Sequence, residues 1–175
     1  HVSSRRQRQM CIRDSLECDG GVTSSINRMK DEGHFSWISG QKKYTFLAIK
    51  AILGWKSQMA WIKVNDKPGR KVDLTGLFAM MQAETFGGGY KVAPGMHPFA
   101  DSASIVLGFG LSKGQMLRVM GPLEKGKHIG RWNKITMEPC TTFEIKALDT
   151  HGDPTEEHGH DPPLFISLDL SLIHI

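Results

Sequence analysis

The chain has 175 residues, with 22 Lys and Arg against 18 Asp and Glu, a formal net charge of +4 and three cysteines. Four of the basic residues and one acidic residue fall within the first 15 positions, so the remainder is close to neutral. The net charge is therefore no evidence for a nucleic-acid or anionic membrane partner, and we expect no nucleic-acid partner. No apolar run approaches the roughly 18 residues of a membrane span, and Cys18 and Cys140 lack the spacing of a disulfide framework or zinc ribbon. We expect one domain, or most of one, in a reducing cytoplasm.

The two ends of the chain differ from the rest. Residues 1–15 carry arginines without an apolar period, and residues 170–175, LSLIHI, form a short apolar tail. Back-translated, LSLIHI resembles the mosaic end of a transposase-based sequencing adapter, and Arg5 to Asp14 resembles the same element read from the other strand. We therefore expect both ends to be adapter-derived tags on a metagenomic fragment, residues 16–169. The alternative is a natural basic arm and an apolar C-terminal strand.

The first expected element is an amphipathic helix over residues 42–56. Its apolar stripe holds Tyr44, Leu47, Ala48, Ala51 and Trp55, with lysines elsewhere. The period then changes to two, so residues 58–66 and 72–85 predict the strands of a β-hairpin, the second of them long. The turn between them, DKPGRK, contains Pro before Gly.

A glycine- and proline-rich loop follows over 86–98, then a buried strand over 102–110. Ser112 is a plausible N-cap for a helix over 111–125, with Leu111, Met116, Val119, Met120 and Leu123 as its apolar positions. Residues 134–148 predict one or two strands, 149–163 an acidic, His-rich loop, and 164–169 a last strand. The fold is therefore expected to be mainly β with a few helices, an α+β domain resembling a β-sandwich.

Three stretches, FGGGYKVAPGMHPFADSASIVLG, LEKGKHIG and PPLFISLD, carry a family resemblance. In this order and spacing they resemble the C-terminal half of the diacylglycerol kinase catalytic family, which includes the bacterial-type lipid kinases. Upstream, GGVTSSINRM and QKKYTFLAIKAILGW are similar to the family's Gly-Phe-Asp-Ser stretch and the helix after it. The family's usual Asn and early Asp fall on Gln82 and Thr23, which departs from the pattern.

The resemblance implies a β-sandwich-like C-terminal domain of the two-domain diacylglycerol/NAD kinase-like fold. The parent enzyme would transfer the γ-phosphoryl group of Mg-ATP to the hydroxyl of a diacylglycerol-like lipid at the membrane surface. The Gly-Gly-Asp-Gly-Thr phosphate loop of such kinases is absent here. The resemblance places it in a separate N-terminal ATP-binding domain, so this fragment alone is expected to be inactive.

The resemblance makes Asp169 the first residue of the family's Asp-Gly-Glu motif and the general base of the reaction. A carboxylate suits this step because it is ionised at neutral pH and can accept the hydroxyl proton. A rival alignment places the motif in the loop at His151 to Asp153, and a third interpretation makes Asp169 an ordinary carboxylate at a strand end.

Three further sets of residues match the family. Gly87, Gly88 and Gly89 would bring backbone N–H groups close to a phosphate, although a bulge or tight strand exit explains them equally simply. Asp101 would help to hold a structural Mg²⁺, or else it caps the following strand. Lys127 and His128 would either face the active-site cleft or end the helix and complement its dipole.

Three other functions stay open at this point. A sphingoid-base or other lipid kinase would have the same motifs. A non-catalytic β-sandwich binding module would lack the ATP-binding domain. A metal-binding protein would use the loop side chains His151, Asp153, Glu156, Glu157, His158, His160 and Asp161, although a solvated loop accounts for them as well.

Overall fold

The computed structural model describes residues 17–56, 59–73, 77–86, 89–148, 151–155, 165–168 and 171–174. In chain order its elements are β1 (Glu17–Gly21), α2 (Val22–Asp31), α3 (Gln41–Gly54), β2 (Met59–Val64), β3 (Arg70–Asp73), β4 (Leu77–Met81), β5 (Ala103–Gly108), α4 (Lys113–Glu124), β6 (Ile135–Cys140), β7 (Phe143–Leu148), β8 (Pro154–Thr155), β9 (Phe165–Leu168) and β10 (Ser171–His174).

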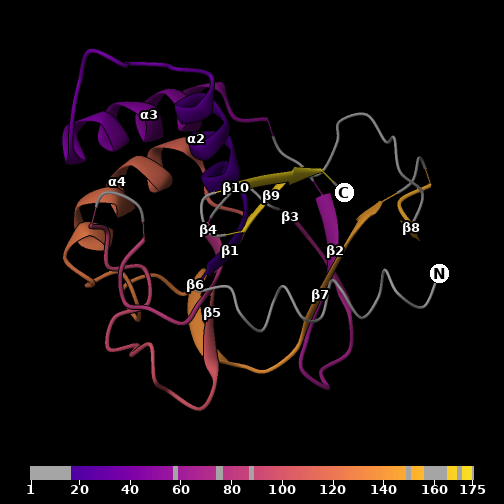
Figure 1. Ribbon diagram of the computed structural model, residues 1–175. Coiled ribbons are helices and arrows are strands. Elements are labelled where there is room, and N and C mark those ends of the chain that lie inside the picture. The colour runs from indigo at the N-terminus through magenta and orange to yellow at the C-terminus, as the bar shows by residue number, and fades with distance from the viewer. Residues whose placement is uncertain are drawn as a thin grey trace.

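The elements form three layers (Figure 1). Within the described ranges, the central layer is a six-stranded antiparallel sheet in the order β10-β9-β1-β4-β5-β6. A second antiparallel sheet, in the order β3-β2-β7-β8, covers one face of it, and α2, α3 and α4 cover the other. The expected sheet-rich, sandwich-like α+β fold is confirmed.

Side-chain alternation along the central strands divides the core in two. In β4, Phe78 and Met80 pack toward the second sheet, whereas Ala79 and Met81 pack toward the helices. Every residue of β5 is buried because both faces of the central sheet are covered. The apolar run over 105–107 and the burial of Ala103 and Ser104 before it therefore follow from the strand's position in the middle layer.

The two helices expected from the sequence are confirmed. The inner stripe of α3 includes Leu47, Ala51 and Ile52, each at most 5% exposed. Ser112 caps α4 in a reciprocal box: the Gln115 N–H donates to the Ser112 hydroxyl, and the Ser112 N–H donates to the Gln115 side chain.

The stretch 134–148, expected as one or two strands, forms two, β6 and β7, which belong to different sheets. Three features of the fold differ from the sequence expectations. The strand expected over 72–85 is divided between sheets, since β3 pairs with β2 and β4 pairs with β1 and β5. Neither β1 nor α2 was predicted. The C-terminal tail is not outside the fold, because Ser171–His174 pairs with β9 as an edge strand.

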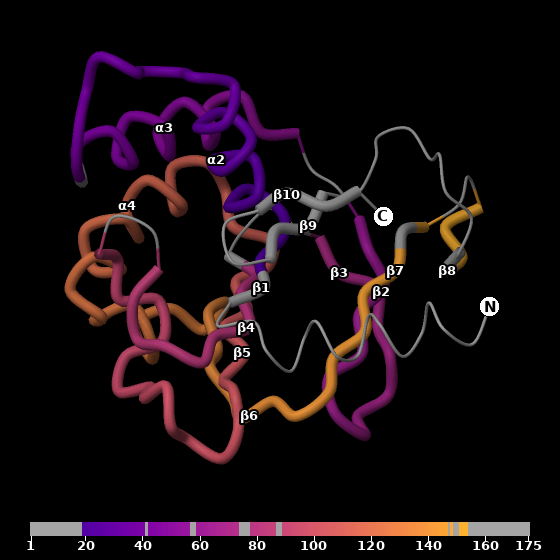
Figure 2. Tube along the Cα trace, viewed as in Figure 1, coloured from indigo at the N-terminus to yellow at the C-terminus, as the bar shows by residue number. Residues whose placement is uncertain are grey.

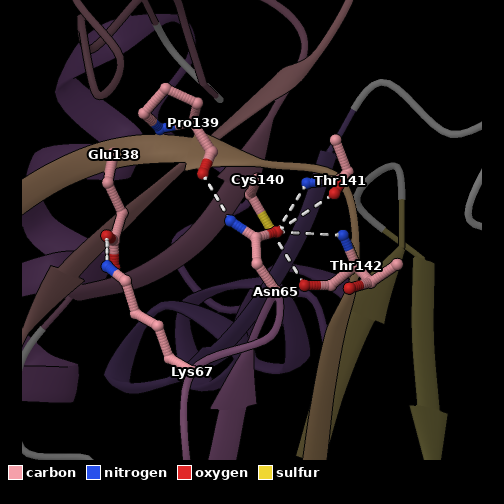
Figure 3. Close-up of polar contacts among 7 residues, drawn as sticks. All are labelled: Asn65, Lys67, Glu138, Pro139, Cys140, Thr141 and Thr142. Atoms are coloured by element: carbon pink, nitrogen blue, oxygen red, sulfur yellow. Dashed lines mark hydrogen bonds and ion pairs between the residues drawn. The ribbon is translucent and has the colours of Figure 1, made fainter.

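Asn65 fastens the corner where the chain passes from β6 to β7 (Figure 3). Its backbone N–H donates to Thr142 O over 2.8 Å, and its side-chain amide donates to Pro139 O over 3.0 Å. The side-chain oxygen accepts the N–H groups of Thr141 (2.9 Å) and Thr142 (3.3 Å). Lys67 pairs with Glu138 beside this cluster. One side chain thus ties the end of β2 to the crossing between the two sheets.

Candidate functional site

The glycine-rich segment forms a tight hairpin in the loop between β4 and β5. Phe86 and Tyr90 pair across it, with their backbone N–H groups donating to each other's carbonyls over 2.8 and 3.1 Å. Gly89 has a φ of +89°, a conformation that favours glycine, and it is exposed. Gly87 and Gly88 lie outside the described residues. The interpretation of Gly89 as a tight turn is supported, and its role in phosphate binding stays a prediction.

Glu84 holds the loop together from its N-terminal side. Its carboxylate pairs with the Lys91 ammonium at 3.0 Å and accepts the Gly95 N–H over 3.3 Å. Its backbone carbonyl accepts the Ala93 N–H over 3.2 Å. The hydrogen bond from Lys91, followed by that from Gly95, lowers the pKa of Glu84 from its ordinary value. The carboxylate is therefore ionised at neutral pH and serves as a fixed anchor for residues 91–95.

The loop meets the segment after α4 at Gly126, so two motifs that are far apart in sequence lie together (Figure 2). A Cβ atom on Gly126 would lie 3.1 Å from Pro94 Cβ and 3.2 Å from Lys91 Cβ. Gly126 also has a φ of +67°. Close approach and left-handed backbone both require glycine here. The Gly-Lys-His stretch thus supports the Lys-Val-Ala-Pro stretch directly.

His128 is fully buried beneath this contact, at 0% exposure. Burial lowers the pKa of its imidazole, and the Val92 backbone partly offsets this effect. The Gly126 and Lys127 N–H groups donate to Leu123 O and Pro122 O over 3.2 and 2.8 Å, which closes the C-terminus of α4. The motif therefore ends the helix, and the alternative in which His128 faces a cleft is wrong.

An apolar pocket of about 90 Å³ lies between the three helices and the glycine hairpin. Its walls include Val22 and Ile26 of α2, Ala48 and Ile52 of α3, Met116 and Val119 of α4, and Phe86 and Tyr90. The Tyr90 hydroxyl is hydrogen-bonded to Thr45 Oγ1 at 2.9 Å, which links the hairpin to α3. The pocket can accommodate hydrocarbon, because its lining is formed almost entirely by carbon atoms.

The candidate metal ligands are not gathered into a site in the described part of the chain. Asp101 lies exposed in the loop before β5. No three His, Cys, Asp or Glu side chains among the described residues could together hold a metal ion. In the His-rich loop, Asp153 pairs with Lys71 at 3.4 Å, and Glu156, Glu157, His158, His160 and Asp161 lie outside the described residues. The role of Asp101 as a Mg²⁺ ligand therefore stays a prediction, and no metal-dependent step is derived from the described residues.

The expected catalytic strand is an inner strand of the central sheet. β9 pairs with β1, with Leu168 opposite Cys18. Asp169 is the next residue in the sequence and lies outside the described residues. Its role as general base therefore stays a prediction, as does the rival placement at His151 to Asp153.

A buried polar group at the start of the domain escaped the sequence analysis. Asp19 and Asn27 are both 0% exposed, and the Asn27 side chain donates to Asp19 Oδ2 over 3.3 Å. The hydroxyls of Thr23 and Ser24 donate to the carbonyls of Gly20 and Gly21. Val22, Ile26 and Met29 recur at helical spacing in this segment, which was the available signal for a helix with a buried face. Neither this spacing nor the resemblance of GGVTSSINRM to the family's Gly-Phe-Asp-Ser stretch indicated a buried carboxylate at Asp19.

Comparison with known families resolves which domain this is. Residues 18–168 match the family described as the YegS C-terminal NAD kinase β-sandwich-like domain. The chain belongs to this family. The matched residues include the three helices and all the strands that the structure describes except β10, and the expected resemblance to lipid kinases is confirmed at the level of the family.

One solved structure supports the YegS-type fold, and a second gives a weaker match. A protein assigned as a diacylglycerol kinase from Bacillus anthracis str. Sterne aligns over 91% of this chain and 47% of its own, with 14% identity and a TM-score of 0.52. A second structure, described as a diacylglycerol kinase of that organism, aligns over 72% of this chain and 40% of its own, with 15% identity and a TM-score of 0.45. The chain thus spans about half the length of the first structure. Among curated proteins, none matches the chain.

Proposed function

We propose that this chain is the lipid-binding half of an ATP-dependent lipid kinase that phosphorylates diacylglycerol or a similar lipid alcohol. The observation that carries the proposal is the apolar pocket between α2, α3 and α4, in a domain of the YegS family. A pocket of this lining suits a hydrocarbon chain, because burying apolar surface contributes roughly 25 cal/mol per Å². The glycine hairpin forms one wall of the pocket.

In the proposed reaction, Asp169 accepts the proton of the lipid hydroxyl. The hydroxyl oxygen forms a bond to the γ-phosphorus of ATP, the bond from that phosphorus to the β–γ bridging oxygen breaks, and ADP leaves. The ATP phosphates and their Mg²⁺ are bound in our proposal by a further α/β domain. In our proposal, Gly87, Gly88 and Gly89 of the present chain approach the bound nucleotide, and Asp101 contributes an oxygen ligand to a structural Mg²⁺.

The pocket can be tested on the chain itself, with dioctanoylglycerol as the probe in titration calorimetry. Ala48 lines the pocket from α3, so Ala48→Leu and Ala48→Phe should weaken binding progressively. Leu117→Phe is the matched control, because Leu117 is 37% exposed on α4 and does not line the pocket. Equal affinity in all four proteins, or no binding to the unchanged chain, contradicts the proposal.

The kinase chemistry needs a second experiment. The reading frame flanking residues 16–169 would be recovered from the source DNA and the longer protein expressed. We expect transfer of labelled phosphate from ATP to dioctanoylglycerol by the longer protein and none by the 175-residue chain. Asp169→Asn should lower the rate by at least about a hundredfold. Transfer by the short chain, or full activity of the variant, contradicts the assignment. Lipid binding without transfer by the longer protein would indicate a binding module.

A further inference from the structure

One face of α3 exposes apolar side chains to solvent. Lys42, Phe46, Ile49 and Leu53 recur at helical spacing on this face, and Lys50 flanks them. Phe46 is 49% and Leu53 is 57% exposed, although both sit in a helix whose opposite stripe is buried. We call this set of five residues the outer face of α3. Large apolar side chains that line up on one exposed helix face indicate a contact surface more than chance exposure does.

The loop before α3 extends this surface with two aromatic residues. The Phe35 ring packs on Phe46 with 5.9 Å between centroids, and Lys50 Nζ lies 5.8 Å from the Phe35 ring centre. A tight turn, in which the Ile38 N–H donates to Phe35 O over 2.9 Å, presents Trp37 with 83% of its surface exposed. An exposed tryptophan beside a helix with lysines and apolar residues is typical of surfaces at the membrane–water interface.

The charge on α3 is entirely positive. Lys42, Lys43 and Lys50 are the ionised side chains of the helix, and Lys56 follows its end. Two acidic residues precede α3 at the end of α2: Asp31 is exposed, and Glu32 pairs with Arg28 at 3.7 Å and with His34 at 3.4 Å. This distribution complements an anionic surface and opposes the pairing of two copies of the same face, because their lysines would repel each other.

We propose that the outer face of α3 and Trp37 dock on an anionic lipid bilayer. Phe46, Leu53 and Trp37 enter the interfacial region, and the lysines bind the anionic headgroups, as in helices that lie in the plane of a membrane surface. No helix that the structure describes has the length and apolar character to cross a bilayer. Attachment through α3 is therefore peripheral in this proposal.

The apolar pocket lies on the opposite side of α3 from the proposed membrane face. Ala48 and Ile52, on the inner stripe, line the apolar pocket. One helix, roughly 10 Å across, thus separates the proposed membrane face from the pocket. A lipid alcohol that leaves the bilayer beside α3 would therefore have only a short path to the apolar pocket. The docking itself goes beyond the proposed function, since it depends only on the surface of α3 and its preceding loop.

Co-sedimentation with vesicles, without ATP, tests the surface independently of any kinase activity. The 175-residue chain would be mixed with vesicles of phosphatidylcholine alone or with about one third phosphatidylglycerol. The arginines of residues 1–15 are present in every variant and add the same background to each. We expect the chain to partition to the anionic vesicles and much less to the neutral ones.

Two matched pairs of variants locate the contact. Lys50→Glu should weaken partitioning at least about fivefold, whereas Lys63→Glu, at an exposed position of β2 in the second sheet, should leave it unchanged. Trp37→Ser should weaken it, whereas Phe99→Ser, at a site that is 90% exposed in another loop, should not.

Equal effects within each pair, or unchanged partitioning by Lys50→Glu and Trp37→Ser, overturn the proposal. A different result also overturns it: the unchanged chain does not bind vesicles but forms a dimer, and Lys50→Glu and Trp37→Ser abolish that dimer. The outer face of α3 would then be the contact surface for a second copy of the chain. Circular dichroism of each variant confirms that folding is preserved. Loss of lipid phosphorylation in the longer protein would not affect any of these outcomes.

Discussion

Replacing Gly126 by alanine tests whether the contact between the two family motifs holds the site together. Alanine at a φ of +67° costs about 1–2 kcal/mol, because its Cβ crowds the following carbonyl in the left-handed region. The new Cβ would also lie 3.1 Å from Pro94 Cβ and 3.2 Å from Lys91 Cβ, closer than ordinary van der Waals contact. Overpacking of this kind costs about 1–3 kcal/mol. Alanine recovers up to about 1 kcal/mol through the entropy of the unfolded chain.

The middle values of these terms give an expected net loss for Gly126→Ala of about 3 kcal/mol, measured by urea unfolding. For a domain of about 150 residues this corresponds to a fall in Tm of about 6–12 °C. Two glycines serve as controls. Gly130 has a φ of +74° but open space around its Cβ position, so Gly130→Ala should lose only about 1 kcal/mol. Gly114, inside α4 and also in open space, should gain up to about 1 kcal/mol as alanine.

The difference between Gly126→Ala and Gly130→Ala isolates the close approach from the backbone cost. If the two variants lose the same stability, Gly126 does not press on Pro94 and Lys91, and the reasoning about the joined motifs is refuted. If Gly114→Ala loses as much as either of them, the effects reflect general sensitivity of the α4 region. The same variants then report on function, because a displaced Pro94 should weaken dioctanoylglycerol binding in Gly126→Ala alone.

Three further predictions concern the scaffold. Asn65→Ala should lower the free energy of unfolding by about 2 kcal/mol in urea titrations, because several hydrogen bonds at the β6–β7 corner are lost; an unchanged midpoint would show that the corner holds without them. Since burial lowers the folded-state pKa of His128, the unfolded chain protonates first as pH falls, so stability should decline below about pH 6.5. His128→Gln should flatten this decline, and an identical pH profile in that variant would contradict the assignment. Burial raises the pKa of the Cys140 thiol to about 11, so in a chain whose other cysteines are serine, iodoacetamide should label it quickly in denaturant and barely in the folded state.

Local patterns were sufficient for several elements. The stripe of α3 and the Ser112 cap of α4 depend on residues within one or two turns, so sequence alone indicates them. The apolar run over 105–107 likewise indicated a buried strand. In α2, Val22, Ile26 and Met29 recur at helical spacing, but polar residues outnumber them in VTSSINRMKD, and this helix was missed. It packs against α3 and β1.

Part of the candidate site could likewise be predicted from local sequence, and part could not. The order of the glycine-rich, Gly-Lys-His and Phe-Ile-Ser-Leu-Asp stretches was enough to indicate the family, which the match over residues 18–168 confirms. The pocket could not be predicted, because Ala48, Tyr90 and Met116 come from three separate segments whose apolar residues are typical of any core. The buried His128 interacts with the backbone of Val92, more than thirty positions earlier in the sequence.

By itself, the sequence determined the family, the β-rich class, the two helices with strong periodicity and the near neutrality of the chain once its ends are set aside. Only the tertiary structure decided which strands share a sheet, which apolar residues surround a pocket and which remain exposed on α3. The physical reason is range. Helix periodicity and capping are settled by neighbours along the chain, whereas sheet partners, buried polar pairs and close approaches such as Gly126 to Pro94 join residues whose separation in sequence carries no local signal.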